Sequence, residues 1–587
     1  MRNGTAERFR RDLTILVMLS VVYTTGSWFV SNSYYQLILT LVPIWAAFGV
    51  SWNILSGYGG QLSFGHASFF GIGGYTMTLA LVYWNLTPWL GIPLGMVVGG
   101  IAAVIIGTPT FRLRGHYFAL SMLAYPLAIL YFLQYFGFQE MSLPMHRDAP
   151  GLFLEFSDPR YYTLVAVGLL AISVFVCILV ENSRFGLALL AVRQNELAAE
   201  AAGIDSKTWK MRALIVSGMI AAGAGGLYAC VQLVVTPDSV FGLLVSAQPV
   251  VLTLFGGVAS LWGPVIGAAF LVPLSKGLDA TVGSYLPGIQ GVVYGGAVIA
   301  IILLAPDGLY WTIRDKFFRQ QAVKPIPAPS KPDRLVNASV TAGTVLMKVE
   351  GLSKNFGGLR AVSNVSFEIA KGEILGIIGP NGAGKTTLFN LLNGVLPPSS
   401  GTATLAGESM IGKKVHQVCR MGVGRTFQVV RSFPRLPLID NVMVGAYGAG
   451  VTDQEAADAA IHALHRTGLA DLAGVEAGSL TNKQLRLMEL ARALAGRPRL
   501  LLLDETLAGL GREECDDILD VLKRLRDEGM TIGIIEHTMH AMLRIADRFV
   551  VLDHGAVLAS GPPRVVVEDR SVIEAYLGKK FLAKLNA

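Results

Sequence analysis

Charged residues are scarce in this sequence. Of its 587 residues only 15% are Asp, Glu, Lys or Arg, whereas 52% are hydrophobic. This balance is unusual for a soluble protein of this length, so we expect a large part of the chain to lie in lipid. Cysteines are few as well, and their scattered positions lack metal-ligand spacing, which argues against a cysteine metal site. We interpret them as buried or reduced thiols: Cys177, Cys230, Cys419 and Cys515.

A signal-peptide cleavage site is also missing. Arg8, Arg10 and Arg11 precede an apolar run over residues 13–29, but no small-residue cleavage site leads to a soluble domain, and further apolar runs follow. We therefore interpret this run as a retained membrane span. The net charge of +7 does not indicate nucleic acid as a partner, because many basic residues flank the apolar runs, as the positive-inside rule describes.

The long apolar runs end near Trp311, and ordinary mixed sequence begins after Leu346. Between them, residues 320–344 are polar and rich in proline, which disfavours helix and favours an extended spacer. We predict a transmembrane domain over residues 1–319, a linker over 320–344 and a soluble domain over 345–587.

The apolar runs predict an all-α membrane domain. They cover residues 13–29, 36–55, 64–83, 88–107, 116–136, 161–180, 211–234, 248–274 and 288–304. This odd number of runs would place the soluble domain on the outer side, away from cytoplasmic ATP. Because Gly256, Gly257, Gly263 and Pro264 interrupt the run over residues 248–274, we interpret it as a hairpin or re-entrant pair. About ten helical segments result.

The basic N-terminus predicts which loops are cytoplasmic. Residues 181–210 would share the cytoplasm with the soluble domain, whereas residues 137–160 and 236–246 would face outward. The middle of the 181–210 loop combines helix-forming residues with charged and apolar positions, which suits a segment that docks on the soluble domain. An ordinary solvated loop helix is the alternative interpretation.

Small and polar residues gather in the membrane half between residues 53 and 74. Small residues let transmembrane helices approach closely, so we interpret the glycines as packing residues: Gly57, Gly59, Gly60, Gly65, Gly71, Gly73 and Gly74. Polar residues are costly in lipid and are candidates for lining a translocation route: Asn53, Gln61, Ser63, His66 and Ser68.

The soluble half contains a P-loop after a strand-like run over residues 374–378 and before a helical pattern. Its residues are Gly379, Pro380, Asn381, Gly382, Ala383, Gly384, Lys385, Thr386 and Thr387. The glycines let backbone amides close around phosphate, Lys385 balances the charge of the β- and γ-phosphates, and the Thr386 hydroxyl can hold Mg²⁺. ATP and Mg²⁺ are therefore the expected cofactors.

A second apolar run, over residues 500–503, ends in Asp504 and Glu505. In phosphoryl-transfer sites an aspartate at this point reaches the magnesium shell and a glutamate polarises the attacking water. Two acidic residues at the end of a strand are common, so this pattern indicates a nucleotide site only in combination with the P-loop.

Three further features make residues 347 to about 580 resemble the ABC ATPases, an α/β P-loop fold with a helical subdomain. The segment RTFQ resembles the Q-loop, which implies that Gln428 senses Mg²⁺ and the attacking water. The segment IIEH resembles the switch region, which implies that His537 contacts the γ-phosphate. Phe356 matches the aromatic residue that stacks on adenine.

The membrane half resembles the permeases of branched-chain amino acid importers. The resemblance rests on the motifs GYGGQLSFGHASFFGIGGYT (57–76), RLRGHYFAL (112–120), SRFGLALLAVRQNELAAEAAGI (183–204) and LLAPDGLY (303–310). In the ATPase half, GVGRTFQ (422–428) and VIEAYLG (572–578) resemble the motor of the same system. This resemblance implies import of hydrophobic amino acids, amides or urea across the bacterial inner membrane. The implied partners are a second permease, a second ATPase and an extracytoplasmic binding protein.

Three departures from the family pattern stand out. The ABC signature reads LTNKQ over residues 480–484, so Asn482 and Lys483 replace glycines that let the backbone approach the partner's γ-phosphate. The D-loop, residues 507–510, is followed by Gly511 where an acidic or amide residue is usual. Residues 137–152 lack the Gly/Asn-rich sequence expected of the outer loop. We therefore expect a poor signature face and a heteromeric assembly, and the substrate stays open.

Two other classes remain as alternatives. An exporter or lipid flippase also fuses membrane and motor domains in this order, but typically has six long spans. A regulatory membrane protein would bind nucleotide and hydrolyse it weakly, which the presence of Lys385, Asp504, Glu505 and His537 argues against.

Overall fold

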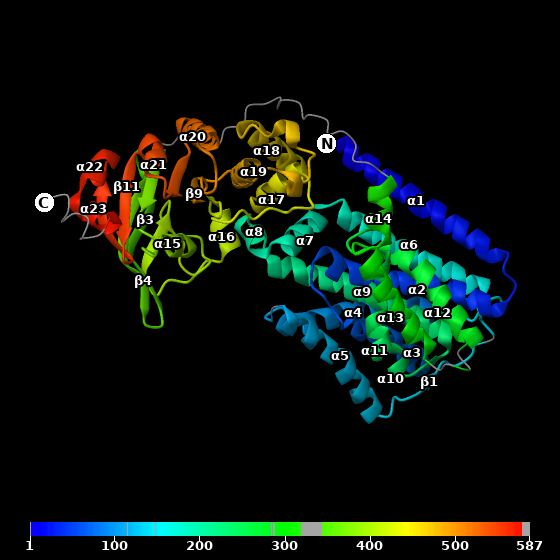
Figure 1. The fold of residues 1–587 in the computed structure, drawn as a ribbon. Coiled ribbons are helices and arrows are strands. Elements are labelled where there is room, and N and C mark those ends of the chain that lie inside the picture. Colours follow the sequence, from blue (N-terminus) through cyan, green and yellow to red (C-terminus); the bar gives the residue numbers. More distant parts are fainter. Residues whose placement is uncertain are drawn as a thin grey trace. The chain divides into compact units, whose positions relative to one another are not determined.

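The computed structural model describes residues 2–113, 115–146, 148–282, 285, 288–317 and 343–577. The chain forms two compact units: residues 1–193 with 207–321, and residues 194–206 with 322–587. Figure 1 labels their elements. Most of the predicted linker lies outside the described residues, since positions 318–342 are not described.

The first unit is helical. Its helices are α1 (Arg2–Trp28), α2 (Ser33–Trp52), α3 (His66–Trp84), α4 (Pro88–Thr110), α5 (His116–Tyr135), α6 (Arg160–Glu181), α7 (Arg184–Gln194), α9 (Ser206–Gln232), α10 (Pro237–Phe241), α11 (Leu243–Gly256), α12 (Gly263–Val282), α13 (Ile289–Leu304) and α14 (Leu309–Phe317). Within the described residues, 7 helical segments are long and apolar enough to cross a membrane. Helices suit this composition because they satisfy every backbone polar group without water.

The predicted break in the run over residues 248–274 is confirmed. Helix α11 ends at Gly256 and α12 begins at Gly263. The two glycines lie so close that a Cβ on Gly256 would stand 1.7 Å from the Gly263 carbonyl oxygen. Asn53 holds the connecting loop, because its side chain donates to the Ser260 carbonyl and accepts from the Ala259 N–H, both at 2.9 Å.

The packing interpretation of the glycines is confirmed at Gly73, where a Cβ would stand 2.0 Å from the Ala222 carbonyl oxygen of α9. The polar residues have a structural role as well. The buried His66 ring contacts Ser63 Oγ at 2.9 Å and Ser217 Oγ at 2.6 Å. Helix α2 continues into a π-helix over Asn53–Tyr58, which the sequence pattern did not predict.

The second unit contains two sheets. The larger sheet has the order β12-β11-β5-β10-β9-β8, and the smaller has the order β4-β3-β6-β7. Their strands are β3 (Val345–Phe356), β4 (Leu359–Ala370), β5 (Ile374–Ile378), β6 (Ser400–Leu405), β7 (Glu408–Ser409), β8 (Val423–Arg425), β9 (Leu500–Asp504), β10 (Thr531–Ile535), β11 (Arg548–Asp553) and β12 (Ala556–Gly561). Outside this unit the described strands are β1 (Met141–Ser142) and β2 (Val234–Val235), which pair antiparallel.

Strands β8, β9, β10, β5 and β11 run parallel. Every residue of β5, β9 and β10 is buried, as expected for a parallel sheet covered on both faces. Because the carboxyl ends of parallel strands lie at the same edge of a sheet, the segments that follow these strands lie close together at that edge.

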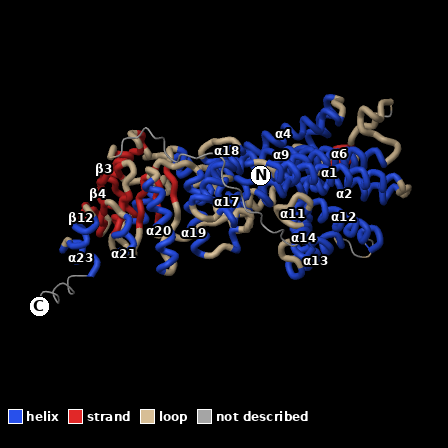
Figure 2. Tube along the Cα trace, turned by 90° about the horizontal axis from the view of Figure 1, so that it is seen from above, coloured by secondary structure: helices blue, strands red, loops and turns tan. Residues whose placement is uncertain are grey.

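Helices cover the sheets and form a separate cluster, and Figure 2 shows the strands concentrated in this unit. They are α8 (Glu196–Ala201), α15 (Lys385–Leu392), α16 (Val415–Arg420), α17 (Leu438–Gly448), α18 (Asp453–Arg466), α19 (Asn482–Ala495), α20 (Arg512–Asp527), α21 (Met539–Ile545), α22 (Pro563–Glu568) and α23 (Arg570–Leu577). Helices α17, α18 and α19 pack against one another as a helical subdomain. The predicted fold class, a helical membrane domain followed by an α/β P-loop ATPase, is confirmed.

Candidate nucleotide site

The P-loop connects the end of β5 to the start of α15. Gly382 and Gly384 have φ values of 84° and 96°, a region that glycine adopts without the strain of a side chain. A Cβ on Gly384 would stand 2.3 Å from the Ala361 carbonyl oxygen. The loop therefore brings backbone amides to a helix N-terminus, an arrangement suited to phosphate.

Lys385 is the first residue of α15 and is buried. Its Nζ donates to the carbonyls of Gly379 at 2.8 Å and Pro380 at 2.9 Å. Burial lowers the pKa of Lys385, and the nearby Glu505 and Asp504 oppose that shift. The ammonium is thus held within the loop, next to two carboxylates.

Asp504 ends β9 and is 1% exposed. Its Oδ2 lies 3.4 Å from Arg425 Nη2, whose guanidinium also donates to Asn390 Oδ1 of α15 at 2.8 Å. Among the described residues Asp504 Oδ1 has no hydrogen-bond partner. Burial raises the pKa of Asp504, and Arg425 opposes this shift.

An unpartnered buried carboxylate oxygen beside a P-loop fits a magnesium ligand. In the described part of the chain there is no group of three or more His, Cys, Asp and Glu that could hold a metal by itself. Mg²⁺ typically uses one or two protein oxygens together with phosphate and water.

Glu505, Gln428 and His537 come from three separate segments and meet at the same edge. Gln428 Nε2 donates to Glu505 Oε2 at 2.7 Å, and His537 Nε2 lies 2.5 Å from Glu505 Oε1. Glu505 has a φ of 49°, an uncommon conformation for a residue with a side chain. The structure therefore brings two distant residues into contact with Glu505: His537, which is 32 positions away in the sequence, and Gln428, which is 77 positions away.

The remaining residues predicted for the nucleotide site lie on the P-loop, in the first turn of α15 or at the surface. Thr386 and Thr387 belong to the first turn of α15 and are half-buried, while Asn381 is exposed and Ala383 is buried. Phe356 ends β3 and is 45% exposed, with Lys354 Nζ 5.2 Å from its ring centroid. Its ring is accessible to a stacking partner.

Glu536 is a site residue that was not predicted from the sequence. Its Oε1 accepts from the Leu507 backbone N–H at 2.6 Å, so the residue before His537 holds the start of the D-loop. Burial raises the pKa of Glu536 to about 7. The sequence signal that could have indicated it is an acidic residue directly after the apolar residues 532–535.

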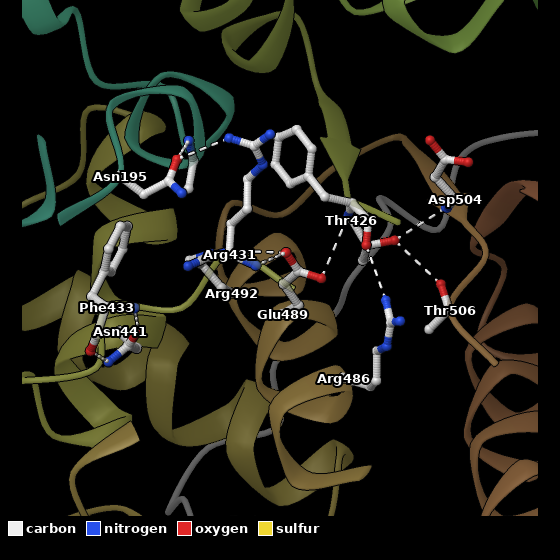
Figure 3. A network of polar contacts seen from close by, with 12 residues as sticks. Asn195, Thr426, Arg431, Phe433, Asn441, Arg486, Glu489, Arg492, Asp504 and Thr506 are labelled. Carbon is white, nitrogen blue, oxygen red and sulfur yellow. Dashed lines mark hydrogen bonds and ion pairs between the residues drawn. The ribbon is translucent and has the colours of Figure 1, made fainter. Parts of the chain in front are cut away.

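The Q-loop is fixed by buried charges of α19, which sequence analysis also missed. Glu489 accepts from the backbone N–H groups of Arg431 at 3.0 Å and Phe427 at 3.5 Å. Arg486 Nη1 donates to the Phe427 carbonyl at 3.0 Å. Figure 3 shows Glu489 and Arg431 in this network, with Arg431 Nη1 reaching Asn195 Oδ1 at 3.3 Å.

Residues 194–206 pack within the ATPase unit, which confirms the predicted docking for this part of the 181–210 loop. Asn195 caps α8, and Ala201 of that helix packs with Val415 and Phe427. Arg420 Nη2 donates to the Gly203 carbonyl at 3.0 Å. A Cβ on Gly448 would stand 2.0 Å from the Ala202 carbonyl oxygen, so the backbones touch there.

The signature segment forms the start of α19. Thr481 and Gln484 make a capping box, with the Thr481 N–H donating to Gln484 Oε1 at 2.9 Å. Asn482 Nδ2 donates to the Gly509 carbonyl of the D-loop at 3.4 Å. Lys483 forms an ion pair with Asp517 of α20, so its side chain is directed along its own domain.

Comparison with known proteins agrees with both halves. The family described as branched-chain amino acid transport system permease component matches residues 34–305. The ABC transporter family matches residues 362–508, and the branched-chain amino acid ATP-binding cassette transporter family matches residues 556–581.

Curated relatives cover the ATPase. The high-affinity branched-chain amino acid transport ATP-binding protein BraF of Pseudomonas aeruginosa is 39% identical over 250 residues, which are 40% of this chain and 98% of BraF. LivG of Escherichia coli, which bears the same description, is 39% identical with the same coverage. A solved nucleotide-free ATP-binding cassette is 28% identical with a TM-score of 0.38, covering 40% of this chain and 100% of its own.

The chain is a membrane protein in which a permease domain is joined to an ABC ATPase that couples ATP hydrolysis to transport. It belongs to the family of branched-chain amino acid ABC transporters.

Proposed function

We propose that this chain imports branched-chain or related hydrophobic amino acids, amides or urea across the bacterial inner membrane. One observation carries the proposal: a single chain joins a permease domain of the branched-chain amino acid type to an ATPase whose relatives serve the same transport. The substrate would arrive on an extracytoplasmic binding protein. A second permease and a second ATPase would complete the assembly.

In this proposal the nucleotide lies between Phe356 and the P-loop. Phe356 stacks on adenine, the loop amides and Lys385 bind the phosphates, and His537 contacts the γ-phosphate. Bound Mg²⁺ would neutralise phosphate charge, held by Thr386, Gln428 and Asp504. The fit of Asp504 rests on its unpartnered Oδ1.

Glu505 polarises the attacking water. Its two carboxylate oxygens contact Gln428 and His537, which supports this role because both contacts fix the carboxylate before nucleotide arrives. The γ-phosphate would recruit His537, leaving one Glu505 oxygen to accept the water proton.

Docking of residues 194–206 connects this site to transport. Phe427 and Arg431 lie on either side of Gln428 in the sequence. The Arg431 side chain donates to Asn195, the N-cap residue of α8, and Phe427 packs with Ala201 of that helix. A movement of α8 would therefore shift the Q-loop. This supports a cytoplasmic position for residues 194–206.

The pairing of β1 with β2 supports the proposed topology, because β1 lies in the 137–160 loop and β2 directly precedes the 236–246 segment, so both assigned loops start from one side of the unit. Single cysteines in residues 137–160 and 236–246, in a variant without the native cysteines, should react with an impermeant thiol reagent from outside. A cysteine in residues 181–210 should react only after permeabilisation. Labelling of that loop in intact cells would reverse the orientation.

Uptake in proteoliposomes tests the function. Vesicles containing the chain, the partner subunits, internal ATP and an external binding protein should accumulate labelled leucine, and the binding protein should stimulate hydrolysis. Efflux of substrate would support the exporter alternative. Nucleotide binding with neither stimulated hydrolysis nor uptake would support a regulatory protein.

A further inference from the structure

The C-terminal helix α23 is anchored in the core of the ATPase. Asp569 Oδ1 accepts from the Ser571 N–H at 2.8 Å and holds the first turn. Val572 is 3% exposed and belongs to the same apolar cluster as Ile378, the last residue of β5. Helix α23 is therefore fixed to the core that supports the P-loop.

Tyr576 lies one helical turn beyond Val572 and so projects from the same face of α23. The Gly379 backbone N–H donates to the Tyr576 hydroxyl at 2.7 Å. Gly379 is the first residue of the P-loop, and a Cβ on it would stand 2.1 Å from the Leu552 carbonyl oxygen. The loop thus starts at a point confined by β11 on one side and by α23 on the other.

Gly379 is held through both of its backbone polar groups. Tyr576 accepts from its N–H, and Lys385 donates to its carbonyl. Nucleotide binding should change only one of these contacts, because the Lys385 ammonium must then exchange a hydrogen bond to a loop carbonyl for one to phosphate. The bond from Gly379 to Tyr576 involves neither the lysine nor the later amides of the loop. Burial raises the pKa of Tyr576, so its hydroxyl stays neutral near neutral pH.

We propose that Tyr576 is a positioning residue of the nucleotide site, which keeps the first turn of the P-loop in its phosphate-binding shape while Lys385 exchanges carbonyls for phosphate oxygens. The residue acts through Gly379 and touches no reacting atom. The inference rests on the P-loop being the nucleotide site. Failure of the unaltered chain to bind ATP would refute that assignment, whereas a normal Tyr576→Phe variant refutes only the role of the tyrosine.

The test uses Tyr576→Phe in the full chain, because phenylalanine retains the ring and removes only the acceptor. Loss of one hydrogen bond to a backbone N–H should raise the Kd and the KM for ATP about two- to tenfold. The kcat at saturating ATP should stay within about twofold of the unaltered chain, because Glu505 and His537 keep their contacts. The melting temperature without nucleotide should change little.

Val572→Ala is the matched control, since it weakens the packing of α23 and leaves the hydroxyl in place. It should lower the melting temperature and change the Kd for ATP less than Tyr576→Phe does. The proposal is overturned if Tyr576→Phe leaves both Kd and KM unchanged, or if it lowers kcat with KM unchanged. It is also overturned if Val572→Ala weakens ATP binding as much, because helix docking rather than the hydroxyl would then be responsible.

Discussion

Two faces of the ATPase differ in how they hold their charges. We call the P-loop with Asp504, Glu505 and His537 the Walker face, and residues 481–484 the signature face. On the Walker face, Asp504 is 1% and Glu505 9% exposed, and Gln428 and His537 hold the glutamate. On the signature face, Lys483 pairs with Asp517 of α20, and these two side chains are 31% and 57% exposed.

This difference indicates which face is already shaped for its task. Both oxygens of the buried Glu505 carboxylate are paired, and breaking such contacts is costly, so this carboxylate keeps its position before nucleotide arrives. An exposed ion pair stabilises a protein by at most about 1 kcal/mol, so the Lys483 contact breaks easily when another surface approaches.

The largest expected effect comes from Glu505→Gln. Glutamine keeps the shape of the side chain but cannot accept a proton from water, so hydrolysis at this site should fall at least about 100-fold. ATP binding should remain, because the carboxylate acts mainly in the transition state. ATP turnover and the Kd for ATP are measured with the partner's site silenced separately. Undiminished turnover at saturating ATP would contradict the assignment.

Lys385→Ala should weaken ATP binding about 10- to 100-fold, because it removes a charge-assisted bond to phosphate. The Kd for ATP is measured directly on the purified chain. Lys348→Ala is a suitable control, since the side chain of this lysine is 48% exposed and pairs with Glu350, outside the P-loop. An equal loss in both variants would show a general charge effect.

The docking contact of residues 194–206 is tested by Gly448→Ala. The new Cβ would stand 2.0 Å from the Ala202 carbonyl oxygen, so the segment must shift. Overpacking of this kind costs about 1–3 kcal/mol, so substrate uptake per ATP hydrolysed should fall about fivefold or more. Gly358→Ala is the control, because a Cβ there meets no atom within 4 Å. Equal coupling ratios in both variants would exclude a docking role.

Glu536 predicts a pH dependence of stability. Burial raises its pKa from the ordinary 4.5 to about 7 in the folded chain, so its contribution to stability is fully present below about pH 4.5 and is lost as pH rises through 7. The loss over this range is on the order of 3 kcal/mol. Thermal unfolding between pH 5 and 8 should show a weaker pH dependence in Glu536→Gln. Parallel curves for the two proteins would place the titration elsewhere.

The sequence predicted contiguous features well and distant contacts poorly. The P-loop and the break between α11 and α12 were predictable because glycines mark them locally. The contact between Tyr576 and Gly379 spans 197 positions, and no local pattern indicates it. The ion pair of Lys483 with Asp517 depends on where α20 packs, so the sequence around residue 483 does not indicate it.

The smallest effect should follow from replacing Asn482 and Lys483 together with glycine. If a partner subunit supplies an intact signature, the Walker face of this chain hydrolyses ATP with that partner, and residues 481–484 serve only the partner's site. Glycine at both positions removes the contacts to Gly509 and Asp517, which are weak and exposed. Total turnover should therefore change by no more than about twofold, all of it at the slower site. The two sites are separated by combining the double glycine variant with Glu505→Gln, which leaves the partner's site as the source of hydrolysis.

A homodimer would behave differently, because each ATP would then meet this signature segment, and the glycines should raise turnover at two equivalent sites. Full substrate-stimulated hydrolysis by the purified chain alone, at two equivalent sites, would show that LTNKQ is a tolerated variant and that the heteromeric assembly is wrong.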